Sequence, residues 1–301
     1  MKLAAACVVL AASIPVQLLA DDYIPPVQGG RTYVQHLITN AKARHPGIVS
    51  IAVIGKRETD KNPVVLGASE NRASVFTPVA RTVEATGAAV GKGGRTYVVR
   101  EPFVSSTGHR IGTITITFAR RGASNDAACR RTAQRIAADL ARATLSAKNA
   151  ADPYPYDPAY GPNTYAQQLT ERTIARHPDL LVMMIHATPP GRDKNIIIGS
   201  NIGRIGKIAD EDDARVIDKG ETNLEVGGDN DRFETELPLN DASGKRIGAL
   251  GLVFSYKASD DKDAIHRHGL AIRDEIARQI PDNAALFRPE AGRTQTAHNG
   301  G

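Results

Sequence analysis

Apolar positions along the chain change between a helical period and a strand period in the same order twice. Each series predicts an amphipathic helix, two strands, a polar helical stretch closed by a glycine, two longer strands joined by a turn, and a last helix. The first series is 31–44, 48–54, a strand ending at Gly67, 75–86 closed by Gly87, 96–104, 110–118 and 126–145. The second is 163–176, 180–185, a strand ending at Gly199, 207–219 closed by Gly220, 232–239, 246–254 and 260–280.

The residues themselves also repeat. Residues 32–46 read TYVQHLITNAKARHP and residues 164–178 read TYAQQLTERTIARHP, an offset of 132 positions. Further on, residues 107–112 match residues 243–248, an offset of 136. Agreement of several segments in one order predicts two copies of one domain, residues 31–146 and residues 164–281. We call them repeat 1 and repeat 2.

The segments outside the repeats have a different character. Residues 1–20 carry Lys2 followed by a largely apolar run and a small residue at a plausible cleavage position, which predicts a secretory signal peptide. The alternative is an uncleaved membrane anchor. Residues 147–163 are rich in Pro and Tyr and predict an extended linker, and residues 282–301 predict a flexible tail. We therefore expect a periplasmic or secreted protein without a stable membrane span after cleavage.

Composition narrows the function classes. Hydrophobic residues make up 41% and charged residues 24%, which is typical of a globular protein. Two Cys exclude a disulfide scaffold, and the net charge of +5 with 5% aromatic residues and no Trp does not indicate a nucleic-acid binder. The motifs for phosphate loops, nucleophile elbows, dinucleotide binding, calcium loops and zinc pairs do not fit, so we expect no enzyme, no metal site and no cofactor.

A glycine turn precedes the last strand of each repeat, as Asp241-Ala-Ser-Gly-Lys-Arg-Ile-Gly248 and Ser105-Ser-Thr-Gly-His-Arg-Ile-Gly112. With the long leading helix and the closing strand pair, this arrangement resembles extracellular PAS-like domains of the Cache type. The element order predicts an antiparallel sheet with its helices on one face. The resemblance implies an α+β fold of two such domains, each an antiparallel sheet with a long N-terminal helix and a C-terminal helix. It also implies a sensor that holds a small molecule between the sheet and the helical connection.

Repeat 2 carries the more polar connection, so we expect the ligand there. The candidate ligand-binding residues are His186, Ser200, Asn201, Arg204, Lys207, Asp210, Asp212 and Asp213. Arg204 and Lys207 suit a carboxylate or phosphate, and the hydroxyl and amide groups suit orientation by hydrogen bonds. The aspartates suit an amine or a metal ion, but their place before an apolar helical run is equally typical of helix capping.

These observations predict an exported, non-catalytic sensor or carrier whose ligand is a small anionic or zwitterionic metabolite bound in repeat 2. Because the chain has no signalling segment, we expect any signal to pass to a membrane-bound signalling or transport protein. One alternative is a metal- or haem-linked uptake accessory that depends on His186 or on residues 210–213. A second is a scaffold for a membrane partner, which would have no pocket.

Overall fold

The computed structural model describes residues 31–290, except 58, 70–86, 92–93, 121, 123–124 and 229. The predicted signal peptide, the helical stretch 75–86 and the end of the predicted tail, 291–301, lie outside the described residues. None of the helices in the described part is both long enough and apolar enough to cross a membrane.

Repeat 1 folds around a five-stranded antiparallel sheet in the order β3-β2-β6-β5-β4. Its elements are β1 (Arg31–Thr32), α1 (Tyr33–Arg44), β2 (Ile48–Gly55), β3 (Val64–Ala68), β4 (Gly87–Val90), β5 (Thr96–Val104), β6 (Arg110–Ala119) and α3 (Asp126–Arg142). The two outer helices, α1 and α3, pack against the sheet and against each other. The core between them holds apolar side chains such as Ile38, Phe103 and Ile136.

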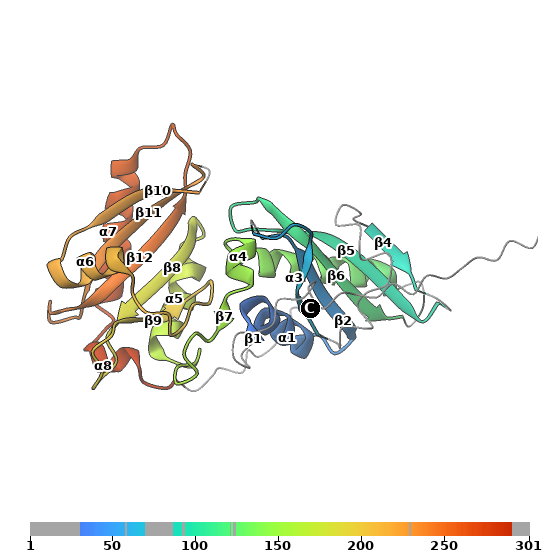
Figure 1. The fold of residues 1–301 in the computed structure, drawn as a ribbon, viewed down its shortest axis with the longest axis horizontal. Helices are drawn as coiled ribbons and strands as arrows, with labels where there is room; N and C mark the ends of the chain where they lie inside the picture. Colours follow the sequence, from blue (N-terminus) through green and yellow to red (C-terminus); the bar gives the residue numbers. More distant parts are fainter. Residues whose placement is uncertain are drawn as a thin grey trace, which may run out of the picture.

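Repeat 2 has a second five-stranded antiparallel sheet, with the order β9-β8-β12-β11-β10. Its elements are α5 (Tyr165–Arg176), β8 (Leu180–Ala187), β9 (Ile196–Ser200), α6 (Glu211–Lys219), β10 (Asn223–Gly227), β11 (Arg232–Asn240), β12 (Arg246–Ser255), α7 (Lys262–Ala277) and α8 (Asn283–Leu286). When the strands of each five-stranded sheet are numbered along the chain, both sheets have the order second-first-fifth-fourth-third. The two sheets occupy separate halves of the molecule (Figure 1).

The leading helices begin in the same way in both repeats. The hydroxyls of Thr32 and Thr164 accept hydrogen bonds from the backbone N–H groups of Gln35 and Gln167, at 3.3 and 3.2 Å. These side chains satisfy N–H groups that have no partner inside the helix. The threonine that the sequence repeat contains is therefore the residue that fixes the start of each helix.

Repeat 2 has helices on both faces of its sheet, which corrects the expectation of helices on one face. Helices α5 and α7 cover one face and bury residues such as Leu169, Leu237 and Ile272. Helix α6 packs on β11 and β12. It lies over the other face of the sheet. Its Asp213 meets Glu236 of β11, whereas the neighbouring Thr235 and Leu237 of the same strand face α7. Successive side chains of a strand point to opposite faces of the sheet, so β8 and β11 each contribute side chains both to the face under α5 and α7 and to the face under α6.

Two edge strands, β4 and β10, were absent from the sequence prediction. Most of their residues are exposed or half-buried, so they carry little apolar alternation. Gly87, expected to close a helix, is the first residue of β4, with φ of 136°. Gly220 does cap α6, in the left-handed conformation with φ of 75°.

The segment between the repeats packs against both of them, which differs from the expected extended linker. It contains α4 (Ala147–Ala150) and β7 (Pro153–Tyr154), and β7 pairs with β1. The buried Asn149 donates from Nδ2 to the carbonyl of Ile202 at 2.9 Å. The start of the predicted tail also packs on repeat 2, because α8 buries Leu286 in its core.

Candidate functional site

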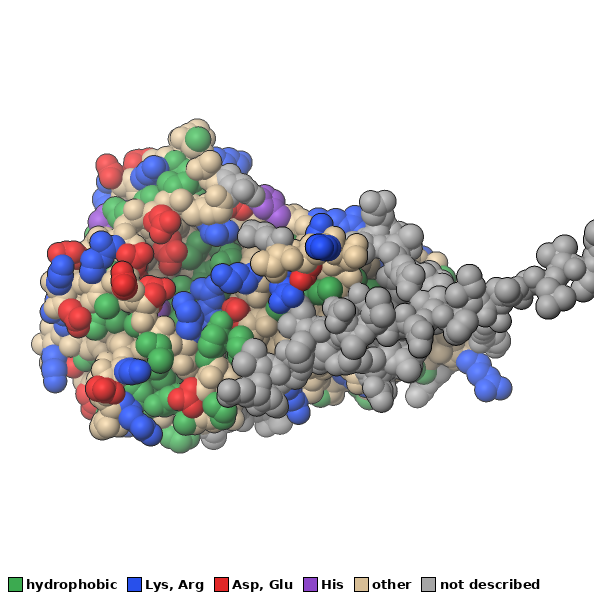
Figure 2. All heavy atoms as spheres, viewed as in Figure 1, with side chains coloured by type: hydrophobic (Ala, Val, Ile, Leu, Met, Phe, Trp, Pro, Cys, Tyr) green, Lys and Arg blue, Asp and Glu red, His purple; other side chains and the backbone are tan. Residues whose placement is uncertain are grey.

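A small cavity of 160 Å³ lies in repeat 2 between the sheet and α6. Its lining residues are Met184, His186, Ile197, Arg204, Lys207, Asp210, Asp212, Asp213, Asn223, Glu225, Glu234 and Glu236. Six of these residues are carboxylic acids, and two are Lys or Arg. Figure 2 shows acidic side chains gathered over the α6 region, with basic side chains next to them toward the middle of the molecule.

The innermost part of the cavity is formed by His186 of β8, Asp213 of α6 and Glu236 of β11. One ligand-type atom from each of the three side chains lies within 4.8 Å of the other two. His186 Nδ1 lies 3.5 Å from Asp213 Oδ2. His186 is 1% exposed, and both of its ring nitrogens lack a hydrogen-bond partner within the described part of the chain. Glu236 Oε1 is buried and unpartnered in the same way.

Burial controls the charge of these groups. It lowers the pKa of His186, against the opposing effect of Asp213, so the imidazole is held neutral. Burial, the hydrogen bond to Asp213 and repulsion by nearby carboxylates raise the pKa of Glu236 to about 9. Burial opposes ionisation of Asp213, but its pKa is still lowered, by the imidazole of His186 where that ring is protonated and by hydrogen bonds from Glu236 and the N–H of Asp210. The centre therefore holds a neutral imidazole, an ionised Asp213 and a protonated Glu236 near neutral pH.

Strand alternation explains how His186 and Glu236 come to face α6. Neighbouring Met183 and Ile185 of β8 point into the main core, whereas Met184 and His186 point to the opposite face. On β12, which separates β8 from β11, Gly251 pairs with both Met184 and Glu236. A glycine there leaves room, because a Cβ atom at Gly251 would lie 3.3 Å from the Met184 methyl group.

Asp213 is positioned by the start of α6. Asp210 accepts from the backbone N–H of Asp213, and Asp213 accepts from that of Asp210 at 2.8 Å, which completes a capping box. The sequence left capping and ligand contact open as alternatives for these aspartates. In the structure Asp213 completes the capping box, and Oδ2 of the same carboxylate also approaches His186 at the cavity, so capping does not remove it from the lining.

The cations at the cavity already have carboxylate neighbours. Arg204 Nε lies 3.6 Å from Asp152 Oδ2, and Lys207 Nζ lies 3.5 Å from Asp210 Oδ2. Arg204 also has a positive φ of 66°, which is uncommon for a residue with a side chain. Asp212 is mostly exposed and pairs with Arg215.

Ser200 and Asn201, also proposed from the sequence, are engaged in backbone contacts. Ser200 Oγ accepts from the N–H of Ile202, and Asn201 bridges the N–H of Met183 and the carbonyl of Leu181, each at 2.9 Å. Ser69 makes the contact that corresponds to Asn201 in repeat 1, where it accepts from the N–H of Ile51. Neither Ser200 nor Asn201 belongs to the cavity lining.

Glu234 and Glu236 were missed by the sequence analysis. The strand reads Arg-Phe-Glu-Thr-Glu-Leu, so both glutamates fall on the face opposite Phe233 and Leu237. Burial and the nearby Glu225 raise the pKa of Glu234. Two acidic residues on one face of a largely buried strand were the signal available in the sequence.

Repeat 1 lacks this cavity chemistry at the matching positions. By strand register, His186 corresponds to Ile54, Glu236 to Arg100 and Gly251 to Thr115. Repeat 1 therefore has neither the imidazole nor the glutamate, and it has a larger residue where repeat 2 has glycine. The residues that correspond to α6 lie outside the described part of the chain.

A larger hollow of 750 Å³ lies near residues 156–160 and the loop before β9. Its charged lining residues, such as Arg192 and Lys194, are exposed or half-buried. The smaller cavity is the stronger candidate, because it holds buried titratable atoms, such as both ring nitrogens of His186, that have no hydrogen-bond partner among the described residues.

No family model matches the chain, and no curated protein matches it significantly. Two solved structures show a low similarity. A putative GAF sensor protein from Burkholderia vietnamiensis is 14% identical with a TM-score of 0.29, over 38% of this chain and 73% of that one. The repressor BlcR from Agrobacterium tumefaciens is 9% identical with a TM-score of 0.26, over 39% and 67%. Similarity at this level assigns neither a family nor a function.

Proposed function

We propose that this protein is a non-catalytic binding protein for a small zwitterionic metabolite, whose ammonium group is held in repeat 2 by His186, Asp213 and Glu236. The observation that carries the proposal is His186, an imidazole that is 1% exposed with both ring nitrogens unpartnered among the described residues. An unsatisfied buried polar group costs about 1–3 kcal/mol. A ligand that supplies the missing hydrogen bond recovers part of that cost.

An ammonium group fits the chemistry of the three residues. It has three N–H donors, and an imidazole nitrogen of His186, the Asp213 carboxylate and the carbonyl oxygen of the protonated Glu236 offer one acceptor each. The Lys and Arg side chains of the lining each have a carboxylate neighbour, whereas Glu236 Oε1 has no partner within the described chain. The cavity therefore favours a positive group at its centre. Arg204 and Lys207 at its edge each have further N–H groups beyond the one that faces its carboxylate neighbour, and these groups suit the carboxylate of a zwitterion.

The size of the cavity limits the ligand. Sites for drug-sized molecules occupy roughly 300–1,000 Å³, and this cavity measures 160 Å³. A molecule of the size of a small amino acid fits this volume. A haem does not, which argues against the haem-linked alternative.

The PAS-like, Cache-type assignment, export to the periplasm or outside, and transfer of a signal to a membrane protein belong to the same proposal. They rest on the sequence repeat, the glycine turns and the apolar N-terminal segment. A ligand cavity between a sheet and its helical connection agrees with what the Cache-type resemblance implies.

A divalent metal ion is the second candidate occupant of the same centre. Ligands about 2.1 Å from a tetrahedral zinc ion are about 3.4 Å apart, close to the 3.5 Å between His186 Nδ1 and Asp213 Oδ2. Zinc would replace the proton on Glu236, so its binding would release protons. Proton release on adding Zn²⁺ distinguishes it from an amine.

The test is a thermal-shift screen with the twenty common amino acids, putrescine, succinate and ZnCl₂. A ligand at a hundred times its dissociation constant adds about 2.7 kcal/mol, which raises the melting temperature by a few degrees. We expect an amino acid to do so in the wild type and in Asp218→Asn, but not in Asp213→Asn. Asp218 is a matched control because it is exposed on the same helix. A response to succinate alone, or none in a cooperatively melting protein, would contradict the proposal.

A further inference from the structure

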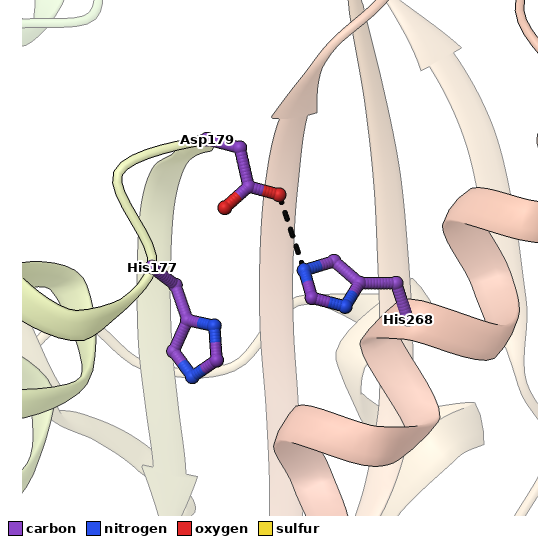
Figure 3. Close-up of side chains that lie close together, drawn as sticks. All are labelled: His177, Asp179 and His268. Carbon is purple, nitrogen blue, oxygen red and sulfur yellow. Dashed lines mark ion pairs between the residues drawn. The ribbon is translucent and has the colours of Figure 1, made fainter.

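A second cluster of titratable side chains lies on the other side of repeat 2, where α5 ends next to α7. His177 caps the C-terminus of α5, Asp179 follows two residues later, and His268 projects from α7. One potential ligand atom from each lies within 4.8 Å of the other two. His268 Nε2 is 3.1 Å from Asp179 Oδ2, and the two imidazole rings are 5.7 Å apart (Figure 3).

A fourth residue fixes the tautomer of His177. Its Nε2 lies 3.2 Å from Glu275 Oε2, and Glu275 also pairs with Arg176 at 2.6 Å. A carboxylate can only accept, so Nε2 carries the hydrogen and Nδ1 keeps its lone pair. Figure 3 shows a ring nitrogen of His177 on the side that faces His268 and Asp179. Histidines that bind metal ions usually donate their other N–H to a carboxylate in this way.

We propose that His177, Asp179 and His268 bind one divalent transition-metal ion, with Zn²⁺ as the reference member of the class. Two imidazoles and one carboxylate suit Zn²⁺, Ni²⁺, Co²⁺ or Cu²⁺, whereas Ca²⁺ and Mg²⁺ prefer oxygen ligands throughout. The side chains of the three residues are 19%, 56% and 41% exposed, respectively. Water therefore reaches the site and completes the coordination.

Repeat 1 shows which part of the cluster the fold itself requires. By the sequence offsets, His177 and Glu275 correspond to His45 and Asp139, and Asp139 acts on the pKa of His45. Asp179 and His268, in contrast, correspond to Gly47 and Thr132. A carboxylate close enough to act on the pKa of the helix-end histidine thus occurs in both repeats, whereas the two additional ligands occur in repeat 2 alone. The shared fold does not require them.

This site is separate from the proposed metabolite cavity, because α5 and α7 cover the face of the sheet opposite α6. A bound ion would join the end of α5 to the middle of α7. It would stabilise repeat 2 according to its concentration, since an ion that binds only the folded state adds free energy of unfolding.

The test is calorimetric titration of tag-free, chelator-treated protein with ZnCl₂, together with the visible spectrum of the Co²⁺ form. We expect the wild type and the control His109→Gln to bind Zn²⁺ at this site with the same affinity. We expect His268→Gln and Asp179→Asn to weaken binding about tenfold or more, and Glu275→Gln to weaken it about 10–100-fold as a positioning residue. His109 is a fair control because it is half-exposed in repeat 1.

A variant that gains a Zn²⁺ site provides a test that cannot be explained by loss of folding. Gly47→Asp with Thr132→His rebuilds the cluster in repeat 1, where a Cβ at Gly47 meets nothing within 4 Å. We expect this variant to bind one more Zn²⁺ than the wild type. Unchanged Zn²⁺ binding in His268→Gln would contradict the proposed metal site. Loss of Zn²⁺ binding in Asp213→Asn, with binding kept in His268→Gln, would place the ion in the metabolite cavity. That result would contradict this inference but not the existence of the cavity.

Discussion

At the scale of single residues, burial sets the charge of the cavity. His186 and Asp213 were proposed from the sequence as ligand-binding residues. His186 comes just before the polar connection that follows a strand, and Asp213 lies within that connection. Glu236 was missed: its place on one strand face could be read from the sequence, but only the packing of α6 on the sheet brings it beside Asp213. Ser200 and Asn201 resemble ligand-binding residues in the sequence. Their hydrogen bonds to backbone groups follow from how β9 leaves the sheet, which no local pattern reveals.

Glu236 gives a residue-scale prediction. Its pKa is about 9 in the folded protein, against an ordinary value of 4.5. Between these values the folded state binds more protons than the unfolded state, so the free energy of unfolding falls as pH rises. We expect Glu236→Gln to make this slope shallower and to raise the melting temperature at pH 8.5 by a few degrees relative to the wild type. At pH 5 the two proteins should melt alike.

The measurement is a pair of melting curves at pH 5 and pH 8.5, with the exposed Glu221→Gln as the control. An unchanged difference between the two pH values in Glu236→Gln would show that this carboxyl is not held protonated. Glu234 has a raised pKa as well, so part of the slope should remain.

At the scale of elements, the sequence predicted the helices and strands that have a clear apolar period, and it did not predict the elements that lack one. The ends of α1 and α5 followed from helical periodicity and the closing Arg-His-Pro, whereas the starts predicted at residues 31 and 163 were two residues early, because Thr32 and Thr164 are the N-caps. The strands β4 and β10 could not be found in this way, because they are held by backbone pairing to β5 and β11 rather than by apolar side chains. The face on which α6 packs is a tertiary property, and the prediction for it was wrong.

The capping box of α6 gives an element-scale prediction. Asp210→Ala removes the acceptor for the N–H of Asp213, and lost N-caps cost about 1 kcal/mol. We expect a drop of a few degrees in the melting temperature, and weaker binding of any amino acid found in the screen. Asp210→Ser keeps an acceptor and should restore most of the stability. Equal melting of Asp210→Ala and the wild type would mean that the box contributes nothing.

At the scale of the whole molecule, the sequence predicted two repeats but not how they meet. Tyr33 Oη donates to the carbonyl of Asn201 at 3.0 Å, and Arg204 reaches Asp152 in the segment between the repeats. Gly203 fits against the Tyr33 ring with a φ of 76°. Arg204 therefore belongs both to the cavity lining and to the interface between the repeats, where the neighbouring Asn201 and Gly203 lie against Tyr33 from a distant part of the sequence.

Gly203 gives the prediction at this scale. A Cβ there would lie 2.6 Å from the Tyr33 ring, so Gly203→Ala adds a collision to the strain of a positive φ. Gly191→Ala is a matched control with a φ of 74° and nothing within 4 Å of its Cβ. We expect calorimetry to show Gly203→Ala melting several degrees below Gly191→Ala, with the transitions of the two repeats separating. Identical melting curves for the two variants would contradict the interface.

The most direct test of the central claim compares amino acids with the 2-hydroxy acids of the same carbon skeleton, such as L-alanine with L-lactate and L-serine with L-glycerate. Titration calorimetry of the wild type and Asp213→Asn measures whether the cavity selects an ammonium group. The account predicts binding of at least one amino acid, loss of that binding in Asp213→Asn, and no binding of its hydroxy acid. Equal or tighter binding of the hydroxy acids would show that the cavity does not select an ammonium group.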